Sequence, residues 1–134
     1  MILWLASYPK SGNTWVRTIL AQVLYSNFDS EKVIETSKKI KLYPSKKYFF
    51  ELDEDFKSSI YPTDRKKVIL EKTISNWEIS QSNINLNNKI NIFKTHNMLC
   101  KLPLKDKEYA FTSIENTMGV IHVVRDPRNI ITSL

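Results

Sequence analysis

The stretch YPKSGNTW (Tyr8–Trp15) joins an apolar run, Ile2–Ser7, to a segment with helical periodicity. A short apolar run that ends in Tyr-Pro is typical of a strand buried on both faces. From Val16 onward, apolar residues recur with i, i+3, i+4, i+7 and i+8 spacing, which predicts a helix from Thr14 to about Ser26. The order strand, loop, helix is the opening of an α/β fold.

The loop between them has the composition of an anion-binding turn. A helix that begins near Asn13 presents unpaired backbone N–H groups and the positive end of its dipole. Gly12, one of two glycines in the chain, allows close backbone approach, and Ser11 and Thr14 add hydroxyl donors. The lysine is Lys10, before the glycine, whereas the lysine of the ATP and GTP loop G-x-x-x-x-G-K-[ST] follows it. The alternative is an ordinary strand-to-helix turn.

Two later apolar segments predict further strands, and polar residues follow each of them directly. Residues 90–94 read INIFK and continue into Thr95 and His96, while residues 119–124 read GVIHVV and continue into Arg125. Parallel pairing would bring all three strand ends to one edge of the sheet. That edge is where open α/β sheets bind ligands.

The segments between these motifs give weaker signals. Asp29 and Ser30 predict the cap of a helix that extends through Ile40. The polar stretch SQSNINLNNK, residues 80–89, predicts a loop. His122 lies within an apolar strand, and we expect it to be structural.

The end of the sequence predicts the start of one more helix. Asp126 is a natural N-cap, and Pro127 is a natural first helical residue. The sequence stops at Leu134, a few residues into that helix. We therefore expect residues 1–134 to form a single domain, truncated at its C-terminus, with residues 27–88 as a variable helical and loop insert.

Charge and composition limit the classes of partner. The net charge of +6 favours an anionic ligand, although a merely soluble basic surface explains it equally well. A single cysteine, Cys100, excludes an internal disulfide and fits a reducing compartment. No apolar run approaches the roughly 20 residues of a membrane span, and no stacking or groove-reading motif appears. We predict a cytoplasmic protein that binds neither membrane nor nucleic acid.

Three of these segments resemble motifs of the sulfotransferases that use 3′-phosphoadenosine-5′-phosphosulfate (PAPS). YPKSGNTW closely resembles their 5′-phosphosulfate loop, typically T-Y-P-K-S-G-T-T-W. VVRDPRNIITSL resembles their 3′-phosphate motif, because Arg125 is followed eight residues later by Ser133. FKTHNM resembles the segment that carries their catalytic histidine. The resemblance extends from about residue 2 to residue 134 and is weak in the middle.

The sequence also departs from the family pattern. Asn13 replaces the commoner threonine, which we expect to be tolerated because both side chains can donate to phosphate. Asn129 stands where the family usually has aspartate. The late glycine- and lysine-rich motif of the family is absent, which puts the activity of these 134 residues alone in doubt.

The resemblance implies a P-loop-like three-layer fold with a central parallel sheet flanked by helices. It also implies sulfuryl transfer from PAPS, without a metal, to the hydroxyl or amine of a small-molecule or carbohydrate acceptor. His96 would be the general base, Lys10 would stabilise the leaving phosphate, and Lys94 would position the transferring group. The residues implied to bind PAPS are Lys10, Ser11, Gly12, Asn13, Thr14, Trp15, Arg125 and Ser133.

Each of these roles has a simpler alternative. His96 could be a hydrogen-bonded structural histidine, and Lys10 and Lys94 could be solvated charges. Arg125 could form a surface ion pair with Asp126 or Glu115. Trp15 could pack against adenine or face the core. A further group of side chains could line an acceptor pocket but more simply packs in the core: Tyr48, Phe49, Phe50 and Cys100.

Two other functions compete with sulfuryl transfer. A P-loop nucleotide kinase or NTPase would need Mg²⁺ and an aspartate at a strand end, for which Asp126 is the candidate. A non-catalytic PAPS-binding fragment would bind the nucleotide without turnover. The sequence leaves the acceptor unidentified and a homodimer open.

Overall fold

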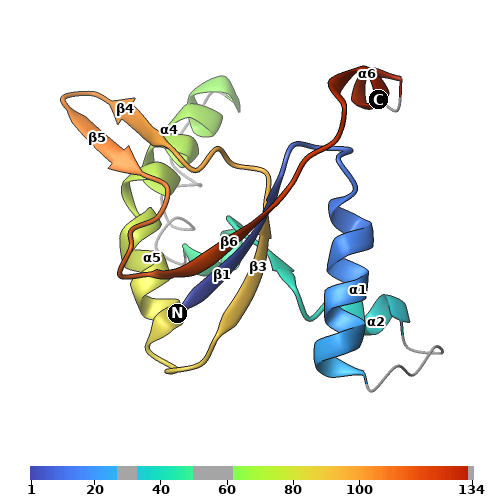
Figure 1. The fold of residues 1–134 in the computed structure, drawn as a ribbon. Coiled ribbons are helices and arrows are strands. Elements are labelled where there is room, and N and C mark those ends of the chain that lie inside the picture. Colours follow the sequence, from blue (N-terminus) through green and yellow to red (C-terminus); the bar gives the residue numbers. More distant parts are fainter. Residues whose placement is uncertain (27–32, 50–61, 133–134) are drawn as a thin grey trace.

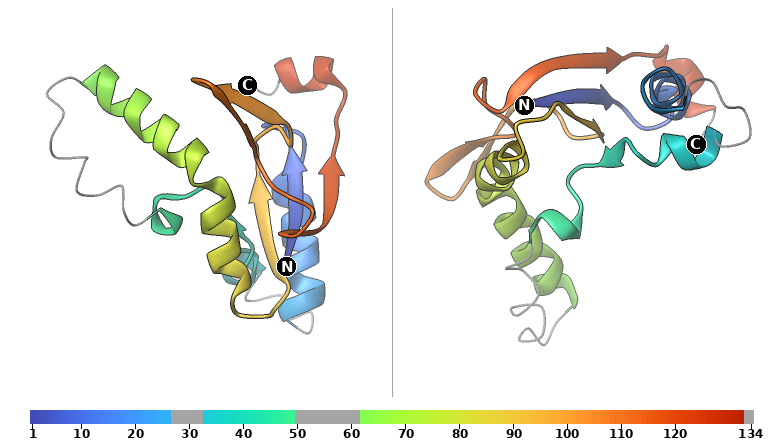
Figure 2. Two further views of the ribbon diagram at one scale, coloured as in Figure 1. Left: turned by 90° about the vertical axis from the view of Figure 1, so that its left-hand side faces the viewer. Right: turned by 90° about the horizontal axis from the view of Figure 1, so that it is seen from below.

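A parallel sheet forms the centre of the computed structural model, which describes residues 1–26, 33–49 and 62–132. Its four strands run in the order β2-β3-β1-β6 (Figures 1 and 2). Strand β1 pairs in parallel with β3 on one side and β6 on the other. The bounds are β1 Ile2–Ser7, β2 Lys41–Leu42, β3 Asn91–Thr95 and β6 Thr117–Val123. The predicted α/β class with a central parallel sheet is confirmed, as are the three predicted strands.

Helices cover both faces of this sheet, giving three layers (Figure 1). One face carries α1 and α2, and the other carries α4, α5 and the antiparallel hairpin β4–β5, which the sequence did not predict. A short helix, α6, follows β6. The bounds are α1 Asn13–Tyr25, α2 Val33–Ser37, 3-10 helix η2 Lys46–Tyr48, α4 Pro62–Ser75, α5 Trp77–Asn85, β4 Lys101–Leu104, β5 Lys107–Ala110 and α6 Pro127–Ile131.

The predicted helices are confirmed in part. Helix α1 agrees with its predicted range to within one residue at each end, and Asp126 and Pro127 begin α6 as predicted. The capping residues predicted at 29 and 30 lie outside the described residues. The loop predicted over residues 80–89 is wrong, because residues 80–85 belong to α5.

The polar residues of α5 are tolerated in a helix because the core supplies their partners. Gln81 is fully buried, and its Nε2 donates to the carbonyl of Phe111 at 2.6 Å. Its Oε1 accepts from the Thr112 hydroxyl, also at 2.6 Å. A buried amide that is satisfied in this way stabilises the helix position that its polarity argues against.

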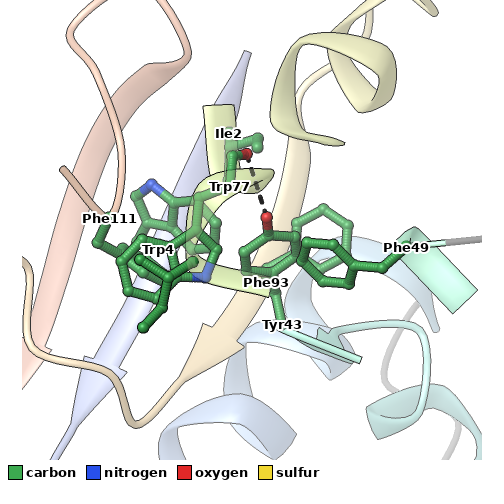
Figure 3. Close-up of a cluster of buried hydrophobic side chains, with 8 residues drawn as sticks. Ile2, Trp4, Tyr43, Phe49, Trp77, Phe93 and Phe111 are labelled. Carbon is green, nitrogen blue, oxygen red and sulfur yellow. Dashed lines mark hydrogen bonds between the residues drawn. The ribbon is translucent and has the colours of Figure 1, made fainter. Parts of the chain in front are cut away.

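The main core lies on the α5 face of the sheet and is aromatic (Figure 3). The ring of Trp4, from the middle of β1, lies 5.3 Å from that of Tyr43 and 5.1 Å from that of Phe111. The Tyr43 hydroxyl donates to the Trp77 carbonyl at 3.3 Å, and burial raises the pKa of Tyr43. Phe49 is buried in this cluster and Tyr48 packs against it, which confirms core packing for both. Cys100 is half-buried, and residue 50 lies outside the described part.

The opposite face holds a smaller core beneath α1. Ala21 is the buried centre of the helix face that meets Ile40 and Ile92. Of the predicted apolar stripe, Ile19 and Val23 remain 59% and 56% exposed. The periodicity therefore predicted the helix correctly but overstated how much of it is buried.

Candidate active site

The three strand ends meet at one edge of the sheet. Ser7 at the end of β1 is in register with Val123 of β6, and Ala6 is in register with Thr95 of β3. Because all three strands are parallel, the segments that follow them leave from the same edge (Figure 2). The predicted convergence of the motifs is therefore a feature of the structure.

The loop after β1 turns sharply into α1. The Ser11 N–H donates to the Tyr8 carbonyl at 3.3 Å, and the first bond of the helix runs from Val16 N–H to the Gly12 carbonyl at 3.2 Å. Lys10 and Gly12 have φ values of 66° and 98°, in the left-handed region. A helix that begins at Asn13 leaves the N–H groups of its first turn without partners inside the helix. This arrangement suits an anion.

The hydroxyl of Ser11 supports the same interpretation. Its Oγ is buried and has no hydrogen-bond partner within the described part of the chain. A buried polar atom without a partner is costly, typically by about 1–3 kcal/mol, so such an atom is a candidate ligand contact.

A hydrogen bond joins the first motif to the third. The Arg125 guanidinium donates through Nη1 to the Lys10 carbonyl at 3.1 Å. Asp126 pairs with Arg128 at 2.7 Å, and the bonds from Arg128 lower the pKa of the Asp126 carboxyl. The carboxylate of Asp126 therefore serves α6 and Arg128, while Arg125 reaches across to the loop.

Asn13 connects the start of the helix to the end of β1. Its side chain is buried, and Nδ2 donates to Ser7 Oγ at 2.9 Å and to the Leu5 carbonyl at 3.3 Å. The Nδ2 group is thus engaged within the protein, whereas Oδ1 is buried without a hydrogen-bond partner in the described part of the chain. The group that Asn13 leaves for a phosphate is its backbone N–H.

His96 is oriented by the same serine. Its Nδ1 lies 2.9 Å from the Ser7 carbonyl oxygen and 3.3 Å from Ser7 Oγ. A carbonyl can only accept, so the shorter bond assigns the proton to Nδ1. In the neutral imidazole, Nε2 then keeps a free lone pair that can take a proton. The ring is exposed, and Thr95 Oγ1 steadies the turn by accepting from the Asn97 N–H at 3.1 Å.

Lys94 lies two residues before His96, in β3, on the face of the sheet that carries α1. Ile92, two residues earlier, packs under α1, and strand alternation gives Lys94 the same face. Burial and the nearby charge of Arg17 on α1 lower the pKa of Lys94. Arg17 Nε is itself buried without a hydrogen-bond partner in the described structure. Two cations close together favour an anion between them.

A cavity of about 400 Å³ lies beside His96, and its lining includes the second histidine, His122. His122, which we expected to be structural, is exposed and lines this cavity, so it is not a core residue. Strand β6 lies at the edge of the sheet, where residues alternate between half-buried and exposed positions. The sequence of this strand is nearly all apolar and carries no signal of that edge position, which follows from the strand order of the described residues.

The remaining predicted site residues are distributed as follows. Thr14 and Trp15 are exposed in the first turn of α1, and Trp15 is 77% exposed, so the core-facing alternative for Trp15 is wrong. Its contact with adenine stays a prediction. Residue 133 lies outside the described residues. The described residues contain no group of three or more His, Cys, Asp or Glu side chains placed to hold a metal ion.

The fold and this edge define an α/β protein in which a strand–loop–helix suited to an anion lies beside an oriented histidine. A family model described as the sulfotransferase domain matches residues 2–134, and the chain belongs to that family. Searches of curated proteins and of solved structures found no match. None of the described helices has both the length and the apolar character needed to cross a bilayer.

Gly12 provides a test of the loop conformation. Gly12→Ala should lower the free energy of unfolding by about 1–2 kcal/mol, because L residues are disfavoured at its φ of 98° although the space around the added Cβ is open. Gly119→Ala is the matched control, because its Cβ would lie at an ordinary 3.5 Å from Leu3 Cδ1. Urea denaturation followed by circular dichroism measures both. Equal effects of the two substitutions would contradict the left-handed loop.

Lys94 provides a test of the two half-buried cations, Lys94 and Arg17. Because its pKa is lower in the folded protein than its ordinary value of 10.5, the folded state binds fewer protons between those two values. The destabilisation is fully present below the folded-state pKa, and stability rises as the pH rises through that interval. Lys94→Met should therefore raise the urea midpoint at pH 7. It should also reduce the increase of the midpoint with pH.

Lys107→Met, which changes an exposed lysine of β5, is the control for this substitution and should leave the midpoint unchanged. A lower midpoint for Lys94→Met would instead mean that the Lys94 ammonium stabilises the free protein.

Proposed function

We propose that the protein transfers a sulfuryl group from PAPS to the hydroxyl or amine of an acceptor. The observation that carries the proposal is the orientation of His96, whose Nδ1 is bonded to Ser7 while its Nε2 stays free, at the edge where the anion-binding loop begins. Membership of the sulfotransferase domain family supports the reaction class.

In this proposal the two ends of the donor bind to two different motifs. The phosphosulfate end lies on the N–H groups at the start of α1 and on Lys10, and the 3′-phosphate lies on Arg125. The bond from Arg125 to the Lys10 carbonyl supports this division, because it holds the two motifs at hydrogen-bonding distance, 3.1 Å. A guanidinium is suited to a phosphate because its N–H groups form a fork that matches two oxygens.

His96 then acts on the acceptor. Its Nε2 takes the proton of the acceptor hydroxyl while the hydroxyl oxygen forms a bond to sulfur. The bond from sulfur to the bridging oxygen of the 5′-phosphate breaks, and adenosine 3′,5′-bisphosphate leaves. Lys10 stabilises the negative charge that develops on the leaving phosphate, and Lys94 positions the transferring group; preorganised cations act in this way in transfer reactions.

The contacts of Asp126 favour sulfuryl transfer over the kinase alternative. A kinase of this class holds Mg²⁺ through an aspartate at a strand end. The carboxylate of Asp126 caps α6 and pairs with Arg128 instead. The second alternative, nucleotide binding without turnover, shares the donor site and differs only in the role of His96.

Titration with adenosine 3′,5′-bisphosphate tests the donor site. We expect metal-independent binding by calorimetry, weakened about 10- to 100-fold in Arg125→Ala, because a hydrogen bond to a charged group contributes about 1.5–3 kcal/mol. Arg128→Ala is the matched control: it also removes an exposed arginine, but one paired with Asp126, and it should keep the affinity.

Preference for MgATP over the bisphosphate would overturn the proposal in favour of a kinase. Binding that is insensitive to Arg125→Ala would remove Arg125 from the donor site. Bisphosphate binding without transfer of ³⁵S from labelled PAPS to any acceptor would support the non-catalytic alternative.

A further inference from the structure

Both histidines of the chain line the same cavity. The sequence contains two histidines, His96 and His122, and they reach the cavity of about 400 Å³ from different elements. His96 comes from the turn after β3, whereas His122 comes from β6 and pairs with Ala6 of β1. Val120, two residues before His122, lies on the same face of β6 and also lines the cavity.

The rest of the lining is uncharged. Apolar side chains contribute much of it, and apart from the imidazoles none of the described lining residues is ionisable near neutral pH. The other members are Ala6, Ser7, Tyr8, Asn97, Met98, Leu99 and Val120. The cationic side chains assigned to the donor, Lys10, Lys94 and Arg125, are not among them. A cavity of this kind suits a neutral, apolar molecule that a few polar groups hold in one orientation.

We propose that His122 is a specificity-determining residue that contacts a second polar group of the acceptor. The assignment rests on the proposed function, in which the reacting hydroxyl of the acceptor faces His96. A neutral imidazole both donates and accepts, so His122 can bond a second hydroxyl on the same apolar body. The preferred acceptor is then an uncharged, apolar compound with two hydroxyl groups, and the apolar lining disfavours a sugar.

The chemistry of polar groups in apolar pockets makes this preference measurable. A site built to bond a hydroxyl loses affinity for an analogue that lacks it, because the polar group of the site is left without its partner. The net contribution of one hydrogen bond is about 0.5–1.5 kcal/mol, which corresponds to about 2- to 12-fold in affinity. The preference should depend on the His122 imidazole and leave donor binding unchanged.

Two naphthalene probes test the assignment. Naphthalene-2,7-diol and 2-naphthol differ by one hydroxyl, and we expect the diol to bind up to about tenfold more tightly. This should exceed the advantage of about twofold that two equivalent hydroxyls give by statistics alone. His122→Phe should reduce the preference to that statistical value while 2-naphthol still binds, and His122→Asn, which keeps a hydrogen-bonding group, should restore part of it.

NMR gives an independent readout because the chain has only two histidines. The diol should shift the ring resonances of both His96 and His122. A shift confined to His96 would overturn the assignment. So would a preference for the diol no larger than the statistical value, or one that survives His122→Phe. Tighter binding of glucose than of the diol would also overturn it.

The affinity for adenosine 3′,5′-bisphosphate separates this inference from the proposed function. His122→Phe should leave that affinity unchanged. Failure of the bisphosphate to bind the wild-type chain counts against sulfuryl transfer, whereas a diol preference that depends on His122 would still support the contact in the cavity. Bisphosphate binding without such a preference would overturn only the role of His122.

Discussion

The parallel pairing of β1 with both β3 and β6 is the constraint on which the rest of the structure depends. Residues of β1 are buried on both faces, so the strand can only occupy the interior of the sheet. Its two neighbours come from distant parts of the sequence, and parallel pairing brings the ends of all three strands to one edge. The contacts that define the candidate site, His96 to Ser7 and Arg125 to Lys10, therefore join residues 89 and 115 positions apart.

Ser7 connects the packing of the sheet to the chemistry at its edge. Its carbonyl accepts from His96, and its hydroxyl accepts from Asn13 at the start of α1. A change in the position of α1 would thus reach the histidine through a single residue. The edge also separates two environments: the loop and its cations suit a multiply charged donor, while the neutral cavity beyond His96 suits an apolar acceptor.

Much of this arrangement was predictable from the sequence, since it depends on local signals. The apolar run of β1, the helical spacing after Val16 and the Asp126-Pro127 pair each specify their own structure, and the three motifs identify the family. Other features depend on tertiary contacts. Strand β2 has two residues and exists because it pairs with β3. Helix α5 is polar in sequence, and its contacts with the core, including the two bonds of Gln81, stabilise it.

The candidate site divides in the same way. Lys10, Gly12, His96 and Arg125 were predictable because they occur in motifs with fixed spacing. The bond from Asn13 to Ser7 was not, because a side chain at a helix start can turn outward or inward and only packing decides. The position of His122 depends on β6 being an edge strand, and strand order cannot be derived from an apolar run alone.

The most direct test of the central claim is a crystal structure of the chain with adenosine 3′,5′-bisphosphate. The account predicts the 5′-phosphate on the backbone N–H groups at the start of α1 and on Lys10, the 3′-phosphate on the Arg125 guanidinium, and His96 Nε2 facing the 5′-phosphate. A nucleotide bound with its phosphates away from this edge, or with His96 turned so that Nδ1 leaves Ser7, would contradict it.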